Sequence, residues 1–331
     1  MSTIWRARHV ALQAPVAIKF LRPDQAPAEL AERLLREARA VARLGHPAIV
    51  RVTDLGENAN GSPFLVMELL HGQSLARLLE IEGPLSAERA VQMLLPIADA
   101  LVVAHRKLIV HRDLKPDNVF LALESQGPQP KLLDFGIAKL ESHRRRRRLT
   151  QVGYVVGSPD YMSPEQASGD DDLDFRSDVW SFCVVLYEVL TGRVPFQADD
   201  YEAQLRAILE NPLDRAGIDD DELWAIIERG LAKDKDERFP SMSRLGQALA
   251  AWLVSRGIQQ DICGNHVEAR WLVAARPTPV PLPAQPPIKS RRRRRIEHAL
   301  PPLVAGLGLA LLAAIGALAW QRLDRLSLIH I

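Results

Sequence analysis

Two polar loops joined by a short hairpin constrain the fold of this chain more than any other feature of its sequence. The first loop reads HRDLKPDN at residues 111–118, and the second reads DFG at residues 134–136. The segments between them, residues 119–123 and 131–133, have the composition of two strands. A hairpin of these strands would bring both loops to the same mouth.

Three side chains of these loops suit phosphoryl transfer. Asp113 offers a carboxylate that can accept the proton of an attacking hydroxyl, and Asn118 and Asp134 offer oxygen ligands for the Mg²⁺ that bridges phosphates. In the alternative interpretation, the two carboxylates only cap ordinary turns. That alternative does not explain why Lys115, Asn118 and Gly136 accompany them at this spacing.

The sequence up to about residue 257 divides into a small strand-rich part and a larger helical part. Strands are expected at residues 4–8, 16–19, 49–55 and 64–69, with an amphipathic helix at 28–44. Helical periodicity then dominates, at residues 87–107, 177–191, 202–210, 222–232 and 243–254. The fold class predicted from this order is α+β.

Charge and cysteine content exclude several classes of protein. The formal net charge is +1, but ten arginines lie in two runs, residues 144–148 and 291–295, and without them the balance would be −9. The basic charge is therefore local, and we predict no nucleic-acid partner. The only cysteines, Cys183 and Cys263, form neither a disulfide framework nor a zinc motif, which is typical of a reducing compartment.

Residues 300–320 contain no charged residue and are long enough for one transmembrane helix. The alternative is a buried core helix, but such a helix seldom lacks a polar face over 21 residues. More positive charge precedes this segment, at residues 291–295, than follows it, at Arg322 and Arg325. The positive-inside rule then predicts a single-pass membrane protein with residues 1–299 in the cytoplasm.

The segments that flank residues 300–320 allow further interpretations. Residues 258–299 are expected to form a proline- and arginine-rich juxtamembrane linker, since residues 276–290 hold six prolines. The arginine run at 291–295 is either a topology anchor or a contact with anionic lipids. Small residues at 306, 310 and 314 would suit a homodimer of membrane helices, although such stripes also arise by chance.

Taken together, residues 3–255 resemble a protein kinase, and the resemblance implies a bilobal fold with a β-rich N-lobe at about 1–70 and a helical C-lobe at about 71–257. It further implies that Asp113 is the catalytic base and that Lys115 contacts the transferring phosphoryl group. Asn118 and Asp134 would hold Mg²⁺, with ATP as the phosphate donor.

The resemblance also assigns an ATP site in the N-lobe. Lys19, in the motif VAIK, would bind the α- and β-phosphates and pair with Glu37 on the helix at 28–44. The segment VMELL resembles the hinge that meets adenine, with Met67 as gatekeeper. The full expected ATP-binding set is Lys19, Glu37, Ile4, Ala17, Met67, Glu68, Leu70 and Phe120.

Four further residues are given structural roles by the same resemblance. Glu165, in the motif SPE, would form a buried ion pair with Arg238, and Asp178 would brace the catalytic loop. Arg112 precedes the catalytic aspartate. A departure from the family pattern is Cys183, which stands at a helix position that is usually glycine.

The substrate class follows from two positions of the resemblance. Lys115, and Ser158 in GSPDYMSPEQASG, are similar to the serine/threonine kinases, in which a hydroxyl at the second position braces the catalytic residues. With residues 300–320, the chain resembles the bacterial receptor-like (eukaryotic-type) serine/threonine kinases. The resemblance implies protein substrates, autophosphorylation and transmembrane signalling, whereas the long segment from 134 to 165 disfavours a small-molecule kinase.

The arginine run at residues 144–148 precedes Thr150 in the expected activation segment. It is either an ordinary solvated loop or a sensor that orders the segment around phosphorylated Thr150 together with Arg112. The two readings differ in whether Thr150 matters for activity.

Both ends of the chain depart from the expected pattern. Residues 1–5 resemble the second half of a kinase glycine-rich loop, so we hypothesise that the first strand and first glycines were lost by a wrong start assignment or a fragment edge. In the tail at 321–331, residues 326–331 resemble a translated sequencing adapter, the alternative being a short genuine tail. If the loss of the glycine loop were genuine, the rival function would be a catalytically impaired signalling scaffold.

Overall fold

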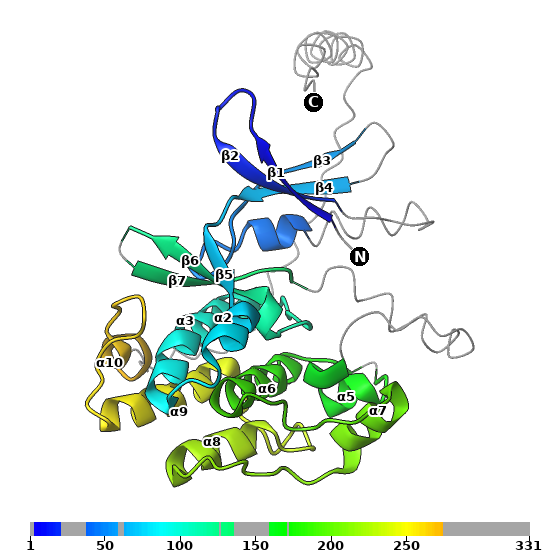
Figure 1. Ribbon diagram of the computed structural model, residues 1–331, viewed down its shortest axis with the longest axis vertical. Coiled ribbons are helices and arrows are strands. Elements are labelled where there is room, and N and C mark those ends of the chain that lie inside the picture. Colours follow the sequence, from blue (N-terminus) through cyan, green and yellow to red (C-terminus); the bar gives the residue numbers. More distant parts are fainter. Residues whose placement is uncertain are drawn as a thin grey trace, which may run out of the picture. The chain divides into compact units, whose positions relative to one another are not determined.

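The computed structural model of the protein divides the chain into two units, Met1–Arg276 and Pro277–Ile331, and the helices and strands labelled in Figure 1 all belong to the first. The structure describes residues 3–20, 38–58, 63–125, 127–135, 159–170 and 172–273, all of which belong to the first unit. Glu37, Thr150, Ser158, the arginine runs and the segment 300–320 lie outside the described residues. Within the described ranges, no helix combines the length and the hydropathy that crossing a membrane requires.

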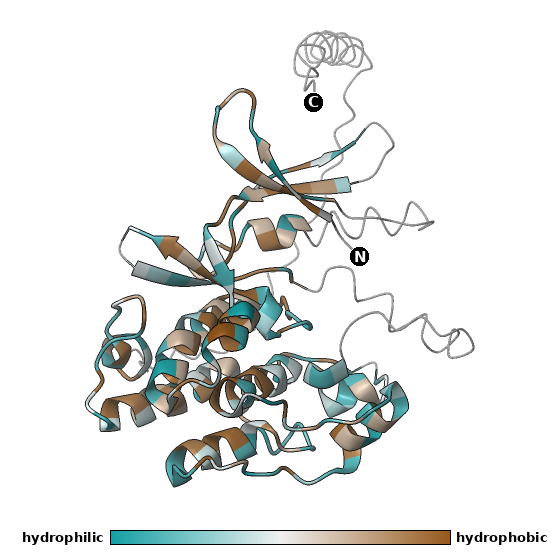
Figure 2. Cartoon of the chain, in the orientation of Figure 1, coloured by the Kyte–Doolittle hydropathy of each residue, from teal (hydrophilic) through white to brown (hydrophobic). Residues whose placement is uncertain are grey.

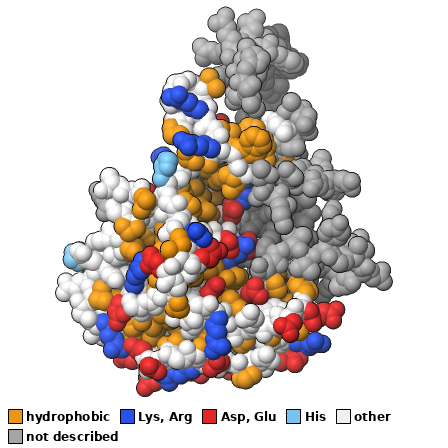
Figure 3. Space-filling view, in the orientation of Figure 1, with side chains coloured by type: hydrophobic (Ala, Val, Ile, Leu, Met, Phe, Trp, Pro, Cys, Tyr) orange, Lys and Arg blue, Asp and Glu red, His pale blue; other side chains and the backbone are white. Residues whose placement is uncertain are grey.

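A four-stranded antiparallel sheet forms the N-terminal part, in the order β1-β2-β4-β3. Its strands are β1 (Thr3–Arg8), β2 (Pro15–Phe20), β3 (Val52–Glu57) and β4 (Pro63–Glu68). The register sets Ala17 opposite Met67 and Lys19 opposite Leu65. Ala17, Leu65 and Met67 join Ala38 and Val50 in a small core. The β1–β2 hairpin also exposes the apolar side chains of Ile4, Trp5, Val10 and Leu12, and Figure 3 shows orange atoms between blue ones in this region.

The C-terminal part is mainly helical, and its core is built around two long buried helices, α3 (Ala87–Arg106) and α6 (Arg176–Thr191). Around them lie α2 (Leu75–Glu82), α5 (Pro164–Ala167), α7 (Tyr201–Glu210), α8 (Asp221–Gly230), α9 (Met242–Ser255), α10 (Val267–Trp271) and the 3₁₀ turn at Pro159–Tyr161. Brown apolar and teal hydrophilic residues alternate along these helices in Figure 2, as expected of helices with one buried face.

Side-chain caps explain where most of these helices begin, because each cap accepts a backbone N–H that the first turn leaves unpaired. The capping residues are Ser74 for α2, Ser86 for α3, Ser163 for α5, Asp200 for α7, Asp220 for α8 and Ser241 for α9. The helices expected at 87–107, 177–191, 202–210, 222–232 and 243–254 all appear, within two residues at each end. The helix expected at 28–44 is described from residue 38 onward, and of these residues 38–42 are helical whereas 43 and 44 are not.

A second sheet carries the two polar loops. Its strands are β5 (Gly72–Ser74), β6 (Val119–Glu124) and β7 (Gly127–Leu132), and β6 follows directly on the 3₁₀ turn Pro116–Asn118. Val119 pairs with Leu132, so the β6–β7 hairpin opens on the two loops as the sequence predicts. Leu132 also donates its N–H to Ala48 O (2.9 Å) and accepts the N–H of Val50 (3.1 Å), which ties the hairpin to the segment that precedes β3.

The folded unit continues beyond the domain end expected at residue 257. Residues 258–273, assigned by the sequence analysis to a linker, instead pack against α3 and α9, and Val267 and Trp271 of α10 are buried. The indole of Trp271 occupies space above Gly246, where a Cβ would lie 2.2 Å from a ring atom. The difference has a physical reason: two apolar residues four apart give α10 a buried face, and glycine in α9 makes room for it.

Cys183, which stands at a position that is usually glycine, is accommodated by a glycine in the facing helix. Cys183 in α6 is fully buried, and burial raises the pKa of its thiol to about 12. A Cβ on Gly230 of α8 would lie 2.1 Å from Cys183 Sγ. The missing side chain at Gly230 therefore compensates for the added one at Cys183.

We expect Gly230→Ala to lower the free energy of unfolding by about 1–3 kcal/mol, because it overpacks the contact between α6 and α8. Adding Cys183→Gly should recover part of the loss, since it removes the clashing atoms. Urea denaturation of the wild type, both single variants and the double variant measures the coupling. Purely additive effects of the two substitutions would contradict this account.

Candidate active site

The HRDLKPDN loop is held in place by one buried carboxylate. Asp178, in the first turn of α6, accepts the backbone N–H groups of His111 and Arg112, both at 2.8 Å, and Nε2–H of His105 at 2.7 Å. Burial alone would raise the pKa of Asp178, but the hydrogen bond and charge of His105 outweigh it and lower the pKa. Arg112 has φ +64°, a costly conformation that these bonds stabilise.

Asp113 and Asn118 contact each other directly. Asn118 Nδ2 donates to the backbone oxygen of Asp113 at 2.7 Å and approaches its carboxylate Oδ2 at 3.3 Å. The ring of His111 accepts the N–H of Asp113 (3.3 Å) and donates to the carbonyl oxygen of Leu133 (2.9 Å). The same ring lies 4.8 Å from that of Phe135, between centroids. His111 thereby links the loop of Asp113 to the loop of Asp134.

Lys19 of β2 reaches across to this site. Its ammonium group forms an ion pair with Asp134, which itself adopts φ +46°. The expected pairing of Lys19 with Glu37 concerns a residue outside the described ranges. Lys115 lies on the same loop as Asp113, with its Nζ 3.8 Å from the carboxylate of Asp117. A positive side chain from the N-terminal sheet and a carboxylate from the hairpin mouth therefore meet.

The oxygen atoms available at the mouth of the hairpin are suitable ligands for Mg²⁺. Asn118 directs its amide nitrogen to Asp113, which leaves the amide oxygen as a ligand, and Asp134 adds a carboxylate. Amide and carboxylate oxygens are suitable ligands, and Mg²⁺ commonly completes its shell with phosphates and water. Over the described part of the chain there is no group of three or more His, Cys, Asp and Glu residues that could hold a metal.

The expected ATP-binding residues of the N-terminal part lie on neighbouring strands. Ala17 and Met67 are buried partners across β2 and β4, whereas Ile4 is exposed on β1, and Leu70 and Phe120 are half-buried. Glu68, at the end of β4, donates its N–H to Arg51 O at 3.0 Å. Its carboxylate accepts the N–H of Arg51 (2.9 Å) and a bond from Lys131 Nζ (3.1 Å).

Glu165 and Arg238 form a two-pronged buried ion pair. The two guanidinium nitrogens of Arg238 lie 2.9 and 2.8 Å from the two carboxylate oxygens of Glu165, and Arg238 is only 1% exposed. Ser177 Oγ donates to Glu165 as well, at 2.7 Å. Arg238 also donates to the carbonyl oxygens of Ala232, Arg176 and Lys233. The pair thus fastens the start of α5 to the region before α9.

The charge of Glu165 predicts sensitivity to acid. Burial would raise its pKa, but the hydrogen bonds and charge of Arg238 lower it from 4.5 to about 2. A carboxyl whose pKa is depressed by folding contributes stability that is present above its unfolded pKa and is lost as the pH falls through the folded one. We therefore expect the free energy of unfolding to fall between pH 4.5 and about 2. Denaturant midpoints across this range should fall less in Glu165→Gln, and parallel curves would contradict the assignment.

Several side chains at the site were not anticipated from the sequence. His105 braces Asp178, Gln166 Nε2 donates to the backbone oxygen of Arg112 (3.2 Å), and the buried Lys131 ion-pairs with Glu68 and Glu124. Of these three residues, only Lys131 could have been noticed in the sequence, because it is a lone charged residue next to an apolar strand. The other two lie in ordinary helical sequence.

Comparison with known proteins agrees with this geometry. The family model described as "Protein kinase domain" matches residues 1–256. Serine/threonine-protein kinase pkn2 of Myxococcus xanthus is 42% identical over 258 residues, covering 76% of this chain and 31% of that protein. Serine/threonine-protein kinase PknB of Mycobacterium tuberculosis is 37% identical over 254 residues, covering 74% and 40%. The chain thus spans about a third of the length of these relatives.

The fold itself is shared with a solved structure. The crystal structure of Rad53 1-466 in complex with AMP-PNP aligns with a TM-score of 0.63 at 22% identity, covering 76% of this chain and 62% of that one. This likeness concerns the fold alone. Together with the match over residues 1–256 and the identities above 35%, it leads to one conclusion: the chain belongs to the protein kinase domain family and is similar to bacterial serine/threonine kinases.

Proposed function

We propose that this protein transfers the γ-phosphate of Mg²⁺-ATP to serine and threonine hydroxyls of proteins, itself included. The observation that carries the proposal is the meeting of Asp113, Asn118, Asp134 and Lys19 at the mouth of the β6–β7 hairpin. The names of the relatives, which are serine/threonine-protein kinases, support the substrate class.

Each of these residues has a task in the reaction. Asp113, oriented by Asn118, accepts the proton of the attacking hydroxyl. Lys19 places a positive charge beside Asp134, where phosphate oxygens would approach. Asn118 and Asp134 would hold Mg²⁺, which would supply positive charge against the phosphate oxygens. Asp178 keeps Asp113 in position through its bonds to the two preceding residues.

The function is tested by incubating the full chain with γ-labelled ATP, Mg²⁺ and dephosphorylated casein. Acid hydrolysis of the products should release phosphoserine and phosphothreonine. Phosphotyrosine alone would contradict the substrate class. Binding of ATP without any transfer would favour the signalling scaffold.

We also propose that phosphorylation of Thr150 activates the protein. Arg112 Nε is buried and has no hydrogen-bond partner in the part of the chain that the structure describes, so the side chain can receive an anion. Phosphatase treatment should lower wild-type activity by about tenfold, because one charge-assisted bond contributes about 1.5 kcal/mol or more. The Thr150→Ala variant should have the low activity from the outset. Equal loss of activity in both proteins on treatment would contradict this role.

A further proposal is that residues 300–320 anchor the protein in a membrane, with the kinase domain in the cytoplasm and two copies pairing through the small-residue stripe. Their length and lack of charge support the anchor, and the preceding arginines support the orientation. After alkaline carbonate extraction of expressing cells, the full chain should stay in the membrane pellet. Release into the supernatant would contradict the anchor.

A further inference from the structure

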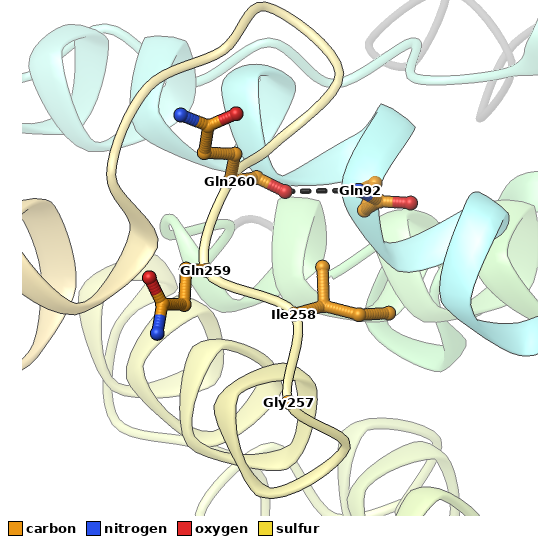
Figure 4. A pocket seen from close by; sticks show the side chains of 5 residues that line it. All are labelled: Gln92, Gly257, Ile258, Gln259 and Gln260. Atoms are coloured by element: carbon orange, nitrogen blue, oxygen red, sulfur yellow. Dashed lines mark hydrogen bonds between the residues drawn. The ribbon is translucent and has the colours of Figure 1, made fainter.

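Residues 258–273, here called the C-terminal strap, are fastened to α3 along its length. Gln92 of α3 donates its side-chain amide to the backbone oxygen of Gln260 (2.9 Å), drawn as a dashed line in Figure 4. Its own backbone oxygen accepts the N–H of Ile262 (3.2 Å). These contacts, with a shallow groove of about 380 Å³ lined by Gln92 and residues 257–260, mark one end of the strap.

The other end of the strap forms an ion pair with α3. Arg270 of α10 donates Nε to Oδ2 of Asp99 (2.9 Å) and a terminal nitrogen to Oδ1 (2.6 Å). Oδ2 also accepts Nε2–H of His46 at 3.0 Å. The side chains of Asp99 and His46 are only 17% and 10% exposed. Both carboxylate oxygens of Asp99 therefore accept hydrogen bonds. The two bonds from Arg270 fix the orientation in which this carboxylate meets the ring of His46.

His46 connects Asp99 by hydrogen bonds to the segment that leads to the active site. Its Nδ1 accepts the N–H of Ala48 (3.1 Å), and Ala48 and Val50 bond to Leu132 on either side. Leu132 lies two residues before Asp134. A continuous series of hydrogen bonds thus runs from the strap through α3 and the segment 46–50 to Leu132 at the end of β7.

We propose that Arg270 is a positioning residue for phosphoryl transfer, which acts through Asp99 and His46 on the segment 46–50 and so on the strand leading to Asp134. Residues 258–273, at the C-terminal end of the folded unit, are then linked to Asp134 in the active site. The catalytic part of this inference rests on the proposed function, whereas the structural part does not.

The first test is hydrogen exchange of the full chain. In Arg270→Met, the amides of Ala48, Val50 and Leu132 should exchange about fivefold faster, because the coupling between such linked sites is typically of this size or larger. The matched control is Arg193→Met, which breaks the exposed ion pair with Asp214 and should leave these amides unchanged. Unchanged exchange in Arg270→Met would overturn the proposal.

A second variant covers the case in which Arg270→Met unfolds the strap altogether. Arg270→Lys keeps the charge and the aliphatic stem, and it should give an intermediate exchange rate at Ala48 and Val50. The Asp99→Asn variant removes the charge, and in its background Arg270→Met should add no further change. Additive effects of Arg270→Met and Asp99→Asn would show that Arg270 acts by another route, against the proposal.

Activity gives the final readout. Arg270→Met should lower kcat by about fivefold and raise the Mg²⁺ concentration for half-maximal rate, with little change in KM for the protein substrate. A merely structural role would lower the amount of active protein and leave the Mg²⁺ requirement unchanged, which would contradict positioning. If the wild-type chain transfers no phosphate, the proposed function fails, and the exchange measurement still decides whether Arg270 controls the segment 46–50.

Discussion

Replacing Asp113 by asparagine should slow phosphoryl transfer by about 10²–10⁴-fold, the usual contribution of a positioned general base. Asparagine has nearly the same shape, and the bond from Asn118 to the backbone oxygen at position 113 remains. The loop is also held independently through Asp178. Binding of ATP and the free energy of unfolding should therefore stay close to wild type, so that the loss appears in kcat.

Initial rates with labelled ATP, together with calorimetric titration of ATP, separate these effects. Asp214→Asn is the matched control, because Asp214 is an exposed partner of Arg193 away from the site. It should retain wild-type rates. An Asp113→Asn protein that kept more than about a tenth of the wild-type rate would show that Asp113 is not the base.

Replacing Arg238 by methionine should lower the free energy of unfolding by about 3–5 kcal/mol, because it leaves Glu165 as a buried carboxylate without its partner. The side chain of Glu165 is only 7% exposed and that of Arg238 is fully buried, so water cannot replace the lost bonds. Methionine fills part of the volume but donates nothing to the carbonyl oxygens of Ala232, Arg176 and Lys233.

Guanidinium denaturation of Arg238→Met, Glu165→Gln and the double variant measures the pair. The double variant should be more stable than Arg238→Met alone, because a neutral amide costs less to bury than an unpaired charge. Arg193→Met, at an exposed pair, should change stability by less than about 1 kcal/mol. A loss of similar size in Arg238→Met and Arg193→Met would contradict the importance of burial.

The elements that the sequence predicted well are those whose cause is local. The hairpin between the HRDLKPDN and DFG loops needed only two apolar segments, and in the structure Val119 pairs with Leu132 at the end next to these loops. Helices such as α7 and α8 were expected from their regular apolar periodicity, and the structure shows that Asp200 and Asp220 cap them. Patterns within ten or twenty residues were sufficient for these.

What could not be predicted depends on partners that are distant in the chain. Asp99 meets Arg270 at a separation of 171 residues, and His105 meets Asp178 at 73. Neither pair leaves a local pattern. Helix α10 is five residues long, too short for periodicity to reveal, and Trp271 finds its place only because Gly246 lies opposite. The domain end at 257 was therefore placed before the strap.

The strap also bears on how the catalytic domain should be excised for study. The family match ends at residue 256, yet burial continues through Trp271. A recombinant fragment cut at the family boundary would uncover the hollow over Gly246 and the Asp99 carboxylate, exchanging a packed surface for an apolar one that favours aggregation. Expression fragments that end at residue 273 or later keep that surface covered. In a solubility screen, such fragments should stay soluble, whereas fragments that end at residue 256 should aggregate.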